Sequence, residues 1–247
     1  MFDSIVRRLK RWYAGLTTYQ LHRSCIICGK VSELPSLALC RECLRMLPWS
    51  GHYCQNCGKP LILATDTLCG RCATHSRIID RLLFPCWYRP PIDELIKALK
   101  FKNQIVCARV LGAILTNYLV KLLDGHTLPQ VIIPVPLHAQ RLRQRGYNQA
   151  KELAAVVANS LHLPINNCYL VRTVNTVPQT LSPTRVRRHH LANAFTININ
   201  NHHAGYQRVA LIDDVFTTGA TVNACVHVLL RSGVKHIQVW CVARASQ

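Results

Sequence analysis

The run VALIDDVFTTGAT, residues 209–221, constrains the fold of this chain more than any other segment. Its four leading apolar residues predict a buried parallel strand. Asp213 and Asp214 follow this strand, and then come a short loop rich in Thr and Gly and a helical segment that ends before Gly233. Because ligands bind beyond the carboxyl ends of strands in open α/β sheets, the run predicts a binding site.

The residue types in this run suit a 5-phosphorylated ribose. Two neighbouring carboxylates accept hydrogen bonds from a ribose diol, so we expect Asp213 and Asp214 to bind the ribose hydroxyls. Small residues, hydroxyls and free backbone amides at the N-terminus of a helix form a cradle for phosphate. The expected phosphate-binding residues are Thr217, Thr218, Gly219, Ala220 and Thr221. The alternative is a structural strand, turn and helix with an incidental Thr-rich cap.

A second candidate anion site lies in the segment 138–149, which follows the strand predicted for 131–137. We expect this segment to form a loop at the same end of the sheet as the acid pair. Its arginines and glycine provide several donors and a close backbone approach, both of which suit a pyrophosphate. The candidate pyrophosphate-binding residues are Arg141, Arg143, Arg145, Gly146 and Asn148. The alternative is a solvated basic turn.

Eight of the 13 cysteines fall in four Cys-x-x-Cys pairs, separated by 11, 10 and 11 residues. Two such pairs supply four thiolates to one tetrahedral ion, so the eight sulfurs predict two closed, structural zinc sites. Pairing in chain order assigns Cys25, Cys28, Cys40 and Cys43 to the first zinc and Cys54, Cys57, Cys69 and Cys72 to the second. Interleaved pairing and iron–sulfur ligation are the alternatives. The remaining cysteines are expected to be small buried apolar residues, at positions 86, 107, 168, 225 and 241.

The rest of the pattern predicts an α/β domain. Two helical stretches fall in 91–123, and the predicted strands and helices then alternate along the chain, which indicates a parallel sheet flanked by helices with one antiparallel pair. We expect a basic amphipathic helix over 1–24, a double zinc-ribbon module over 25–80 and the α/β domain over 81–247. A polar stretch near 173–190 predicts a mobile lid or a nucleic-acid contact with Arg185, Arg187 and Arg188, or else a disordered basic loop.

The charge of the chain indicates an anionic partner. It has 30 basic and 11 acidic residues, a net charge of +19, which favours nucleic acid, phosphorylated ligands or an anionic membrane face. We find no secretory signal, and the apolar segment 110–123 is interrupted by Asn117 and Lys121 and is short for a membrane span. We therefore expect a cytoplasmic protein without a transmembrane segment, with peripheral membrane attachment through the first helix as an alternative.

The run 209–221 resembles the phosphoribosyl pyrophosphate (PRPP) motif of type I phosphoribosyltransferases. The order of the motifs along the chain is similar to that of the ComF/GntX family, also called competence protein F or ComFC. The segments that carry this resemblance are the Cys-x-x-Cys pairs, LIKALKF at 95–101, PVPLHAQRLRQRGYNQA at 134–150, LIDDVFTTGAT at 211–221, and Arg172, Gln179, Leu181 and Arg185 between them. It covers nearly the whole chain from Cys25 onward.

The resemblance implies a type I phosphoribosyltransferase-like fold and a role in natural transformation, the uptake of DNA by bacteria. It also implies PRPP with Mg²⁺ as a ligand, single-stranded DNA and the DNA-uptake machinery at the inner membrane as partners, and Lys100 as a residue of the same cleft. We favour a protein that handles incoming single-stranded DNA on a PRPP-binding scaffold, with Tyr147, Tyr206 or Trp87 as stacking faces. The alternatives are an active phosphoribosyltransferase with an unknown acceptor and a PRPP-responsive regulator. The sequence assigns no catalytic residue.

Overall fold

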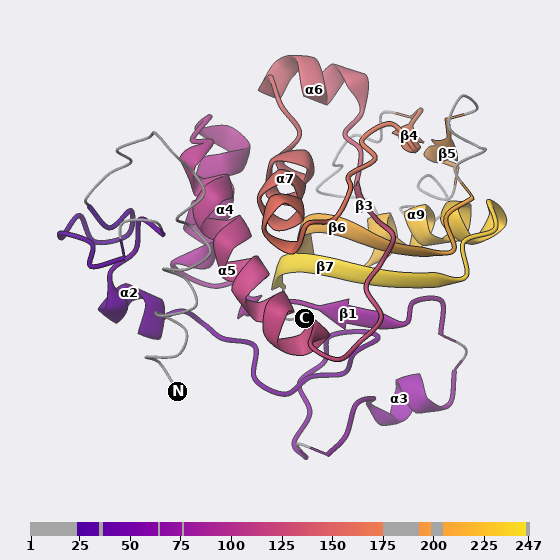
Figure 1. Ribbon diagram of the computed structural model, residues 1–247, viewed down its shortest axis with the longest axis horizontal. Helices are drawn as coiled ribbons and strands as arrows, with labels where there is room; N and C mark the ends of the chain where they lie inside the picture. Colours follow the sequence, from indigo (N-terminus) through magenta and orange to yellow (C-terminus); the bar gives the residue numbers. More distant parts are fainter. Residues whose placement is uncertain are drawn as a thin grey trace, which may run out of the picture.

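A parallel β-sheet lies at the centre of the computed structural model (Figure 1). The structure describes residues 24–34, 37–63, 65–75, 77–174, 193–198 and 205–245. Within these residues the sheet contains the strands β1 (Arg81–Leu83), β2 (Cys86–Trp87), β3 (Val131–Pro134), β6 (Arg208–Phe216) and β7 (His236–Arg244). Their order is β1–β7–β6–β3, β2 also pairs with β7, and these pairings are parallel.

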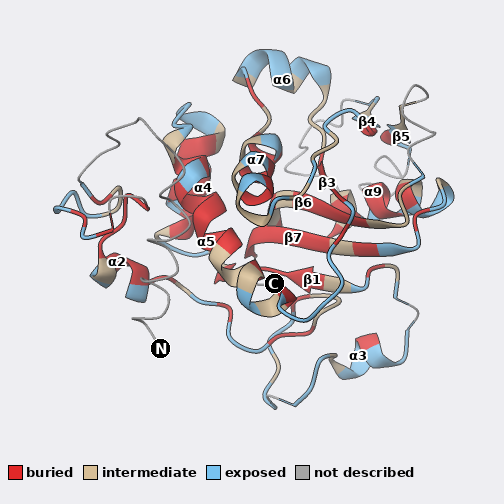
Figure 2. Cartoon of the chain, in the orientation of Figure 1, coloured by how far each residue is buried: buried red, intermediate tan, exposed pale blue. Residues whose placement is uncertain are grey.

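Continuous apolar runs place the central strands between two layers of helices. Alternate residues of β6 point to opposite faces, so Ala210 and Ile212 enter one core and Val209 and Leu211 enter the other. The first core contains α4 (Ile92–Phe101), α5 (Val106–Leu123) and α7 (Gln149–Leu161). The second core contains α9 (Ala220–Arg231). Figure 2 shows the buried residues of helices and strands facing one another.

The helices form because their apolar residues recur at the spacing of one helix face. In α9, Val222, Cys225, Val226 and Leu229 follow this spacing and are buried against the sheet. The antiparallel pair β4 (Leu170–Arg172) and β5 (Phe195–Ile197) lies against α9, outside the main sheet. The predicted α/β fold, a parallel sheet flanked by helices with one antiparallel pair, is confirmed.

Among the described residues, one helix, α5, has the length and hydropathy of a membrane span. It begins at Val106, four residues before the apolar segment predicted from the sequence, so the segment is not too short to span. However, 61% of it is buried inside the protein, where it contacts α4, α7 and β7. Gly112 permits the contact with α7, since a Cβ there would lie 2.7 Å from Cβ of Val156. We interpret α5 as a core helix.

Both ribbon segments contact the α/β part. The first contains the short helix α2 (Arg41–Arg45), and its apolar side chains share one core with α4 and α5. These buried residues are Leu34, Leu37, Leu39, Leu44 and Leu47. The second contains α3 (Gly70–Ala73), and Arg244 at the end of β7 donates from Nε to the carbonyl oxygen of Cys57, over 3.1 Å. The amphipathic helix expected over 1–24 lies almost wholly outside the described residues.

The structure corrects three local predictions. The segment 138–149 is not a loop, because 139–145 form the helix α6 (Ala139–Arg145), capped by the His138 ring at its start and ended by Gly146 at φ 81°. The strand β6 does not end before the acid pair, because its pairing with β7 continues to Phe216. Cys168 is exposed, whereas the other four non-cluster cysteines are buried as expected.

Candidate functional site

The acid pair of β6 is asymmetric. Asp213 is partly exposed, whereas Asp214 is buried and its Oδ2 lies 2.8 Å from Nζ of Lys100 at the end of α4. The backbone N–H of Asp214 donates to Oδ1 of Asp213, over 2.9 Å. Neighbouring strand residues point to opposite faces, which explains why the two carboxylates have different surroundings. Lys100, expected to belong to this cleft, is therefore connected directly to the acid pair.

Asp213 lies where ionisation is unfavourable. Burial, followed by the charge of Asp214, raises the pKa of Asp213 to about 7, while Lys100 and Arg172 oppose this shift. A carboxyl group in such a place gains from a ligand that offers hydroxyl donors or brings a cation.

The predicted phosphate loop lies at the N-terminus of α9, beside the acid pair. Thr217 and Thr218 are exposed, and Gly219 at φ 76° is the N-cap without a side-chain cap. A Cβ at Gly219 would lie 2.7 Å from Cζ of Phe216, so the close approach of the loop to β6 requires a glycine. Ala220 and Thr221 open the helix, and the N–H of Ala220 is 3.4 Å from Oγ1 of Thr218. The five predicted residues therefore lie together at a helix N-terminus.

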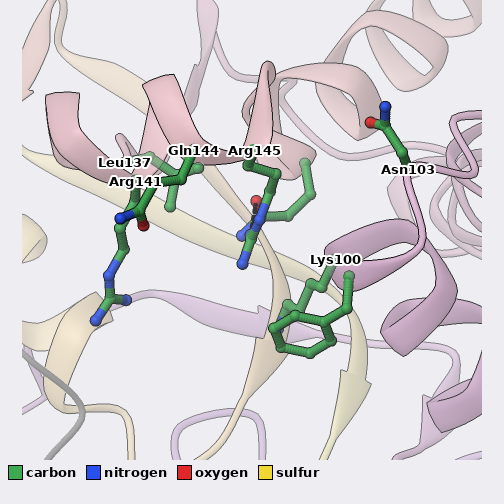
Figure 3. Close-up of a pocket in the computed structure, with 8 residues that line it drawn as sticks. Lys100, Asn103, Leu137, Arg141, Gln144 and Arg145 are labelled. Atoms are coloured by element: carbon green, nitrogen blue, oxygen red, sulfur yellow. Dashed lines mark hydrogen bonds between the residues drawn. The ribbon is translucent and has the colours of Figure 1, made fainter.

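A basic pocket of about 720 Å³ lies between α6 and the end of α4 (Figure 3). Its described lining residues include three cations and no acid: they are Lys100, Phe101, Asn103, Leu137, Arg141, Gln144, Arg145 and Gln149. In Figure 3, Arg141 and Arg145 extend from the same helix on the side of Lys100.

The predicted pyrophosphate residues separate into two groups. Arg141 and Arg145 are one helical turn apart and line the pocket. Arg143 is exposed and is not among the lining residues, because its position on the helix α6 points it in a different direction. Gly146 ends α6, and Asn148 caps α7 by accepting from the N–H of Ala150 and donating to the carbonyl oxygen of Val135, each over 3.0 Å. Gly146 and Asn148 therefore fix the ends of two helices and are not among the lining residues of the pocket.

Sequence reasoning missed several residues near the pocket. Phe101 and Gln149 both contact Arg145: its Cζ lies 5.5 Å from the Phe101 ring centroid, and its Nη1 donates to Oε1 of Gln149, over 2.6 Å. Arg172 interacts electrostatically with residues of both parts of the site: burial, followed by the charge of Arg141, lowers the pKa of Arg172, while Asp213 acts in the opposite direction. The family motifs included Arg172, but only as a marker of their order.

Three expectations about DNA contacts have different outcomes. Arg185, Arg187 and Arg188, predicted for the lid, lie outside the described residues. The prediction that Tyr147 is a stacking face is wrong, because its side chain is buried and its hydroxyl donates to the carbonyl oxygen of Leu99. Trp87 and Tyr206 are partly buried and pack edge-on against Phe84 and Tyr169, with each pair of ring centroids 5.3 Å apart.

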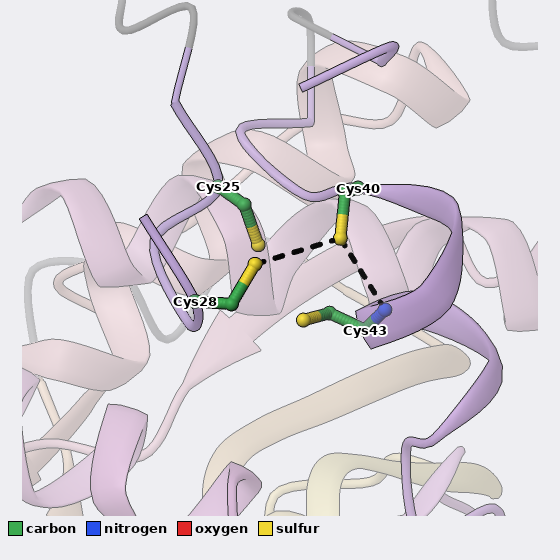
Figure 4. A group of neighbouring side chains, drawn as sticks. All are labelled: Cys25, Cys28, Cys40 and Cys43. Atoms are coloured by element: carbon green, nitrogen blue, oxygen red, sulfur yellow. Dashed lines mark hydrogen bonds between the residues drawn. The ribbon is translucent and has the colours of Figure 1, made fainter. Parts of the chain in front are cut away.

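Two four-cysteine clusters form as predicted by pairing in chain order. The sulfurs of Cys25, Cys28, Cys40 and Cys43 lie within 4.8 Å of one another, and so do those of Cys54, Cys57, Cys69 and Cys72. Figure 4 shows the first cluster converging on one point. The sulfurs of Cys28 and Cys40 are 3.7 Å apart and those of Cys57 and Cys69 are 3.8 Å apart. Four zinc–sulfur bonds of about 2.3 Å in a tetrahedron require about 3.8 Å, so both clusters fit structural zinc.

The surroundings favour the thiolate at one cysteine of each cluster. Burial opposes ionisation of Cys25 and Cys54, but nearby backbone amides outweigh it and lower the pKa of each to about 7. Burial raises the pKa of Cys43, which a bound cation would overcome. In the second cluster Nδ2 of Asn56 donates to the sulfur of Cys72, over 3.3 Å, as outer donors to metal ligands do.

A double four-cysteine module, a parallel sheet and a basic pocket together define a zinc-ribbon α/β protein. Residues 19–73 match the double zinc ribbon domain family. The chain is 36% identical over 223 residues to competence protein F of Haemophilus influenzae, covering 90% of this chain and 96% of that protein. It is 32% identical over 222 residues to DNA utilization protein YhgH of Escherichia coli O157:H7, covering 89% and 96%.

A more distant relative is competence protein ComFC of Bacillus subtilis, which is 28% identical over 201 residues, covering 78% of this chain and 77% of that protein. The chain belongs to the competence protein F family.

Proposed function

We propose that this protein handles single-stranded DNA during DNA uptake and that the carboxyl edge of its sheet binds PRPP with Mg²⁺. The names of its relatives, competence protein F, DNA utilization protein and ComFC, support the connection with DNA. The observation that carries the proposal is the basic pocket, which Lys100, Arg141 and Arg145 line and which Lys100 connects to Asp214 of the acid pair. Three cations around about 720 Å³ suit a ligand with several phosphate charges.

The parts of PRPP have separate partners in this proposal. The loop 217–221 binds the 5-phosphate through helix N-terminal amides, and the ribose hydroxyls donate to the acid pair of Asp213 and Asp214. Because Asp214 is buried and paired with Lys100, Asp213 is the more accessible acceptor of the two. Arg141 and Arg145 face the pyrophosphate, to which Mg²⁺ supplies further charge neutralisation. The net charge of +19 attracts the DNA strand along the wider surface, with a cytoplasmic protein at the inner-membrane uptake machinery as its setting.

Transfer of ribose 5-phosphate from Mg·PRPP to an acceptor is the second candidate function. It is favoured by the position of the acid pair, the phosphate loop and the basic pocket at one edge of the sheet. A regulator that binds PRPP without turnover uses the same site. Release of pyrophosphate in the presence of an acceptor distinguishes the enzyme from the regulator.

Calorimetric titration of the zinc-loaded protein with PRPP and Mg²⁺ tests the PRPP site. We expect Arg141→Gln to weaken binding about 10- to 100-fold, because it removes a charge-assisted hydrogen bond to phosphate. Arg143→Gln is the matched control, since this arginine lies two residues away on the same helix but does not line the pocket, and it should bind like the wild type.

Different results would contradict the PRPP site and the DNA role. No heat of binding with the wild-type protein, or equal losses in the two arginine variants, would contradict the PRPP site. Fluorescence anisotropy with a labelled single-stranded oligonucleotide tests the DNA role. A wild-type affinity that does not fall steeply as salt rises would contradict it, because phosphate contacts release counterions.

A further inference from the structure

The side chain of Phe101 has an unusual position. It is the last residue of α4 and is 74% exposed, whereas Leu95, Ile96 and Leu99 of the same helix are buried in the core. Scattered apolar side chains are common on protein surfaces, but this one lines the basic pocket. Neither the ribose, the phosphates nor Mg²⁺ of PRPP presents an aromatic face, so the proposed function leaves Phe101 without a role.

The ring of Phe101 is held in place from one side. The guanidinium carbon of Arg145 lies 5.5 Å from the ring centroid, within the range of a cation–π contact. Arg145 is in turn fixed by its bond to Gln149 at the start of α7. With 74% of its surface exposed, the phenyl group remains accessible to a planar partner. Because Arg145 already holds the ring, binding costs little further side-chain entropy.

The other lining groups complement a nucleotide. Lys100 and Arg141 provide positive charge for a backbone phosphate. Asn103 and Gln144 carry amides, and Figure 3 shows them at opposite ends of the pocket, Gln144 on α6 near Arg141 and Asn103 beyond the end of α4. An amide both donates and accepts, as the edges of nucleobases do. The volume of about 720 Å³ falls in the range of about 300–1,000 Å³ that is typical of small-molecule sites.

We propose that Phe101 is the stacking platform for a nucleobase of the single strand, and that the pocket holds one nucleotide unit of the DNA. The base stacks on Phe101, and the adjoining phosphate meets Arg141 and Lys100. This inference rests on the proposed handling of single-stranded DNA and names the site that would perform it. It also places DNA and PRPP in adjoining or overlapping parts of one pocket, since Arg141 faces both.

The test compares two probes of equal length and phosphate number: labelled oligothymidylate and an abasic deoxyribose-phosphate oligomer. Fluorescence anisotropy of the zinc-loaded full chain gives both affinities. We expect Phe101→Leu to weaken oligothymidylate binding about 5- to 150-fold, because it removes base–aromatic stacking. Phe101→Trp should bind within about threefold of wild type, since a larger ring preserves the stack. Leu142→Ala, an exposed apolar residue outside the pocket lining, is the control and should bind like wild type.

Two further readouts separate stacking from a structural effect. The abasic oligomer should bind wild type and Phe101→Leu equally, and the slope of log affinity against log salt should be the same for both proteins. Unchanged oligothymidylate binding by Phe101→Leu would overturn the inference while the DNA role stands, as would an equal loss of the abasic oligomer. If the wild type binds neither oligomer, the proposed DNA role itself fails, and this inference fails with it.

Discussion

Asp213 lies where an ionised carboxylate lowers the stability of the folded protein. Burial and the neighbouring Asp214 raise the pKa of Asp213 to about 7 from the ordinary value of 3.8. A group whose pKa is raised on folding contributes fully to the stability of the folded protein only below its unfolded pKa. This contribution to the free energy of unfolding is lost as pH rises through the folded pKa. The ionised form therefore destabilises the folded protein progressively between about pH 4 and pH 7. Residues held in such surroundings are typical of binding sites.

The first prediction concerns Asp213→Asn. We expect this variant to be more stable than the wild type at pH 8, by on the order of 1–3 kcal/mol, because an amide carries no charge to desolvate. At pH 5 the difference should be smaller, since most of the wild-type Asp213 is then protonated. The same variant should bind PRPP more weakly, as the carboxylate acceptor for the ribose hydroxyls is gone.

Urea unfolding at both pH values and calorimetry with PRPP measure these effects. Asp124→Asn, at the exposed end of α5, is the control, and its stability relative to wild type should not change with pH in this way. Equal stability of Asp213→Asn and the wild type at pH 8 would show that Asp213 is not under electrostatic strain.

At the scale of elements, the loop between β6 and α9 depends on one glycine. Gly219 has a left-handed φ of 76°, and a Cβ attached to it would lie only 2.7 Å from Cζ of Phe216. Gly125, after α5, has a similar φ of 74°, but a Cβ there would have nothing within 4 Å. These two glycines thus separate the cost of backbone conformation from the cost of a steric contact.

We therefore predict that Gly219→Ala destabilises the protein more than Gly125→Ala does. The conformational cost common to both should be about 1 kcal/mol, and displacement of Phe216 by the new methyl group should add about 1–3 kcal/mol. Thermal unfolding of the two variants provides the comparison, and PRPP affinity should fall only for Gly219→Ala. Equal destabilisation would mean that Phe216 moves aside without cost.

The elements also show which features the sequence reveals. The apolar strand of 209–212 and the two helices within 91–123 were predictable, because their apolar runs and spacing reflect burial directly. The helix α6 was missed because its seven residues carry no apolar face, and this error placed Arg143 with Arg141. The strands β1 and β2 contain three and two residues, and only their pairing with β7 defines them. The Lys100–Asp214 ion pair depends on tertiary structure, which local pattern does not encode.

At the scale of the whole molecule, Arg244 connects the second cysteine cluster to the end of β6. Its Nε donates to the carbonyl oxygen of Cys57, and its Nη1 donates to the carbonyl oxygen of Phe216 over 3.4 Å. Its guanidinium also lies over the Phe216 ring, 5.2 Å from the centroid. Phe216 contacts Gly219, so a continuous series of contacts runs from the zinc ribbon to the phosphate loop.

Loss of the second zinc should therefore affect both stability and ligand binding. We predict that Cys54→Ser with Cys57→Ser releases about one zinc of two, lowers the midpoint of thermal unfolding and weakens PRPP binding. The loss of unfolding free energy should be smaller than the free energy of zinc binding in zinc-finger peptides, which is about 10–16 kcal/mol. Metal content is measured with a chromogenic chelator after denaturation. Cys168→Ser, an exposed cysteine outside both clusters, should retain two zinc ions. Full zinc content in the double variant would contradict the ligand assignment.

The position of β7 has a consequence for the order in which the protein can form during synthesis. β7 follows every other described strand in the chain, yet it lies between β1 and β6 in the sheet. The two cysteine clusters leave the ribosome long before His236–Arg244, while the surfaces they will cover are still incomplete. Zinc can therefore bind the nascent ribbons first, and the sheet closes only when its latest strand inserts between partners made earlier. Until then, the edges of β1 and β6 remain open to mispairing with other chains.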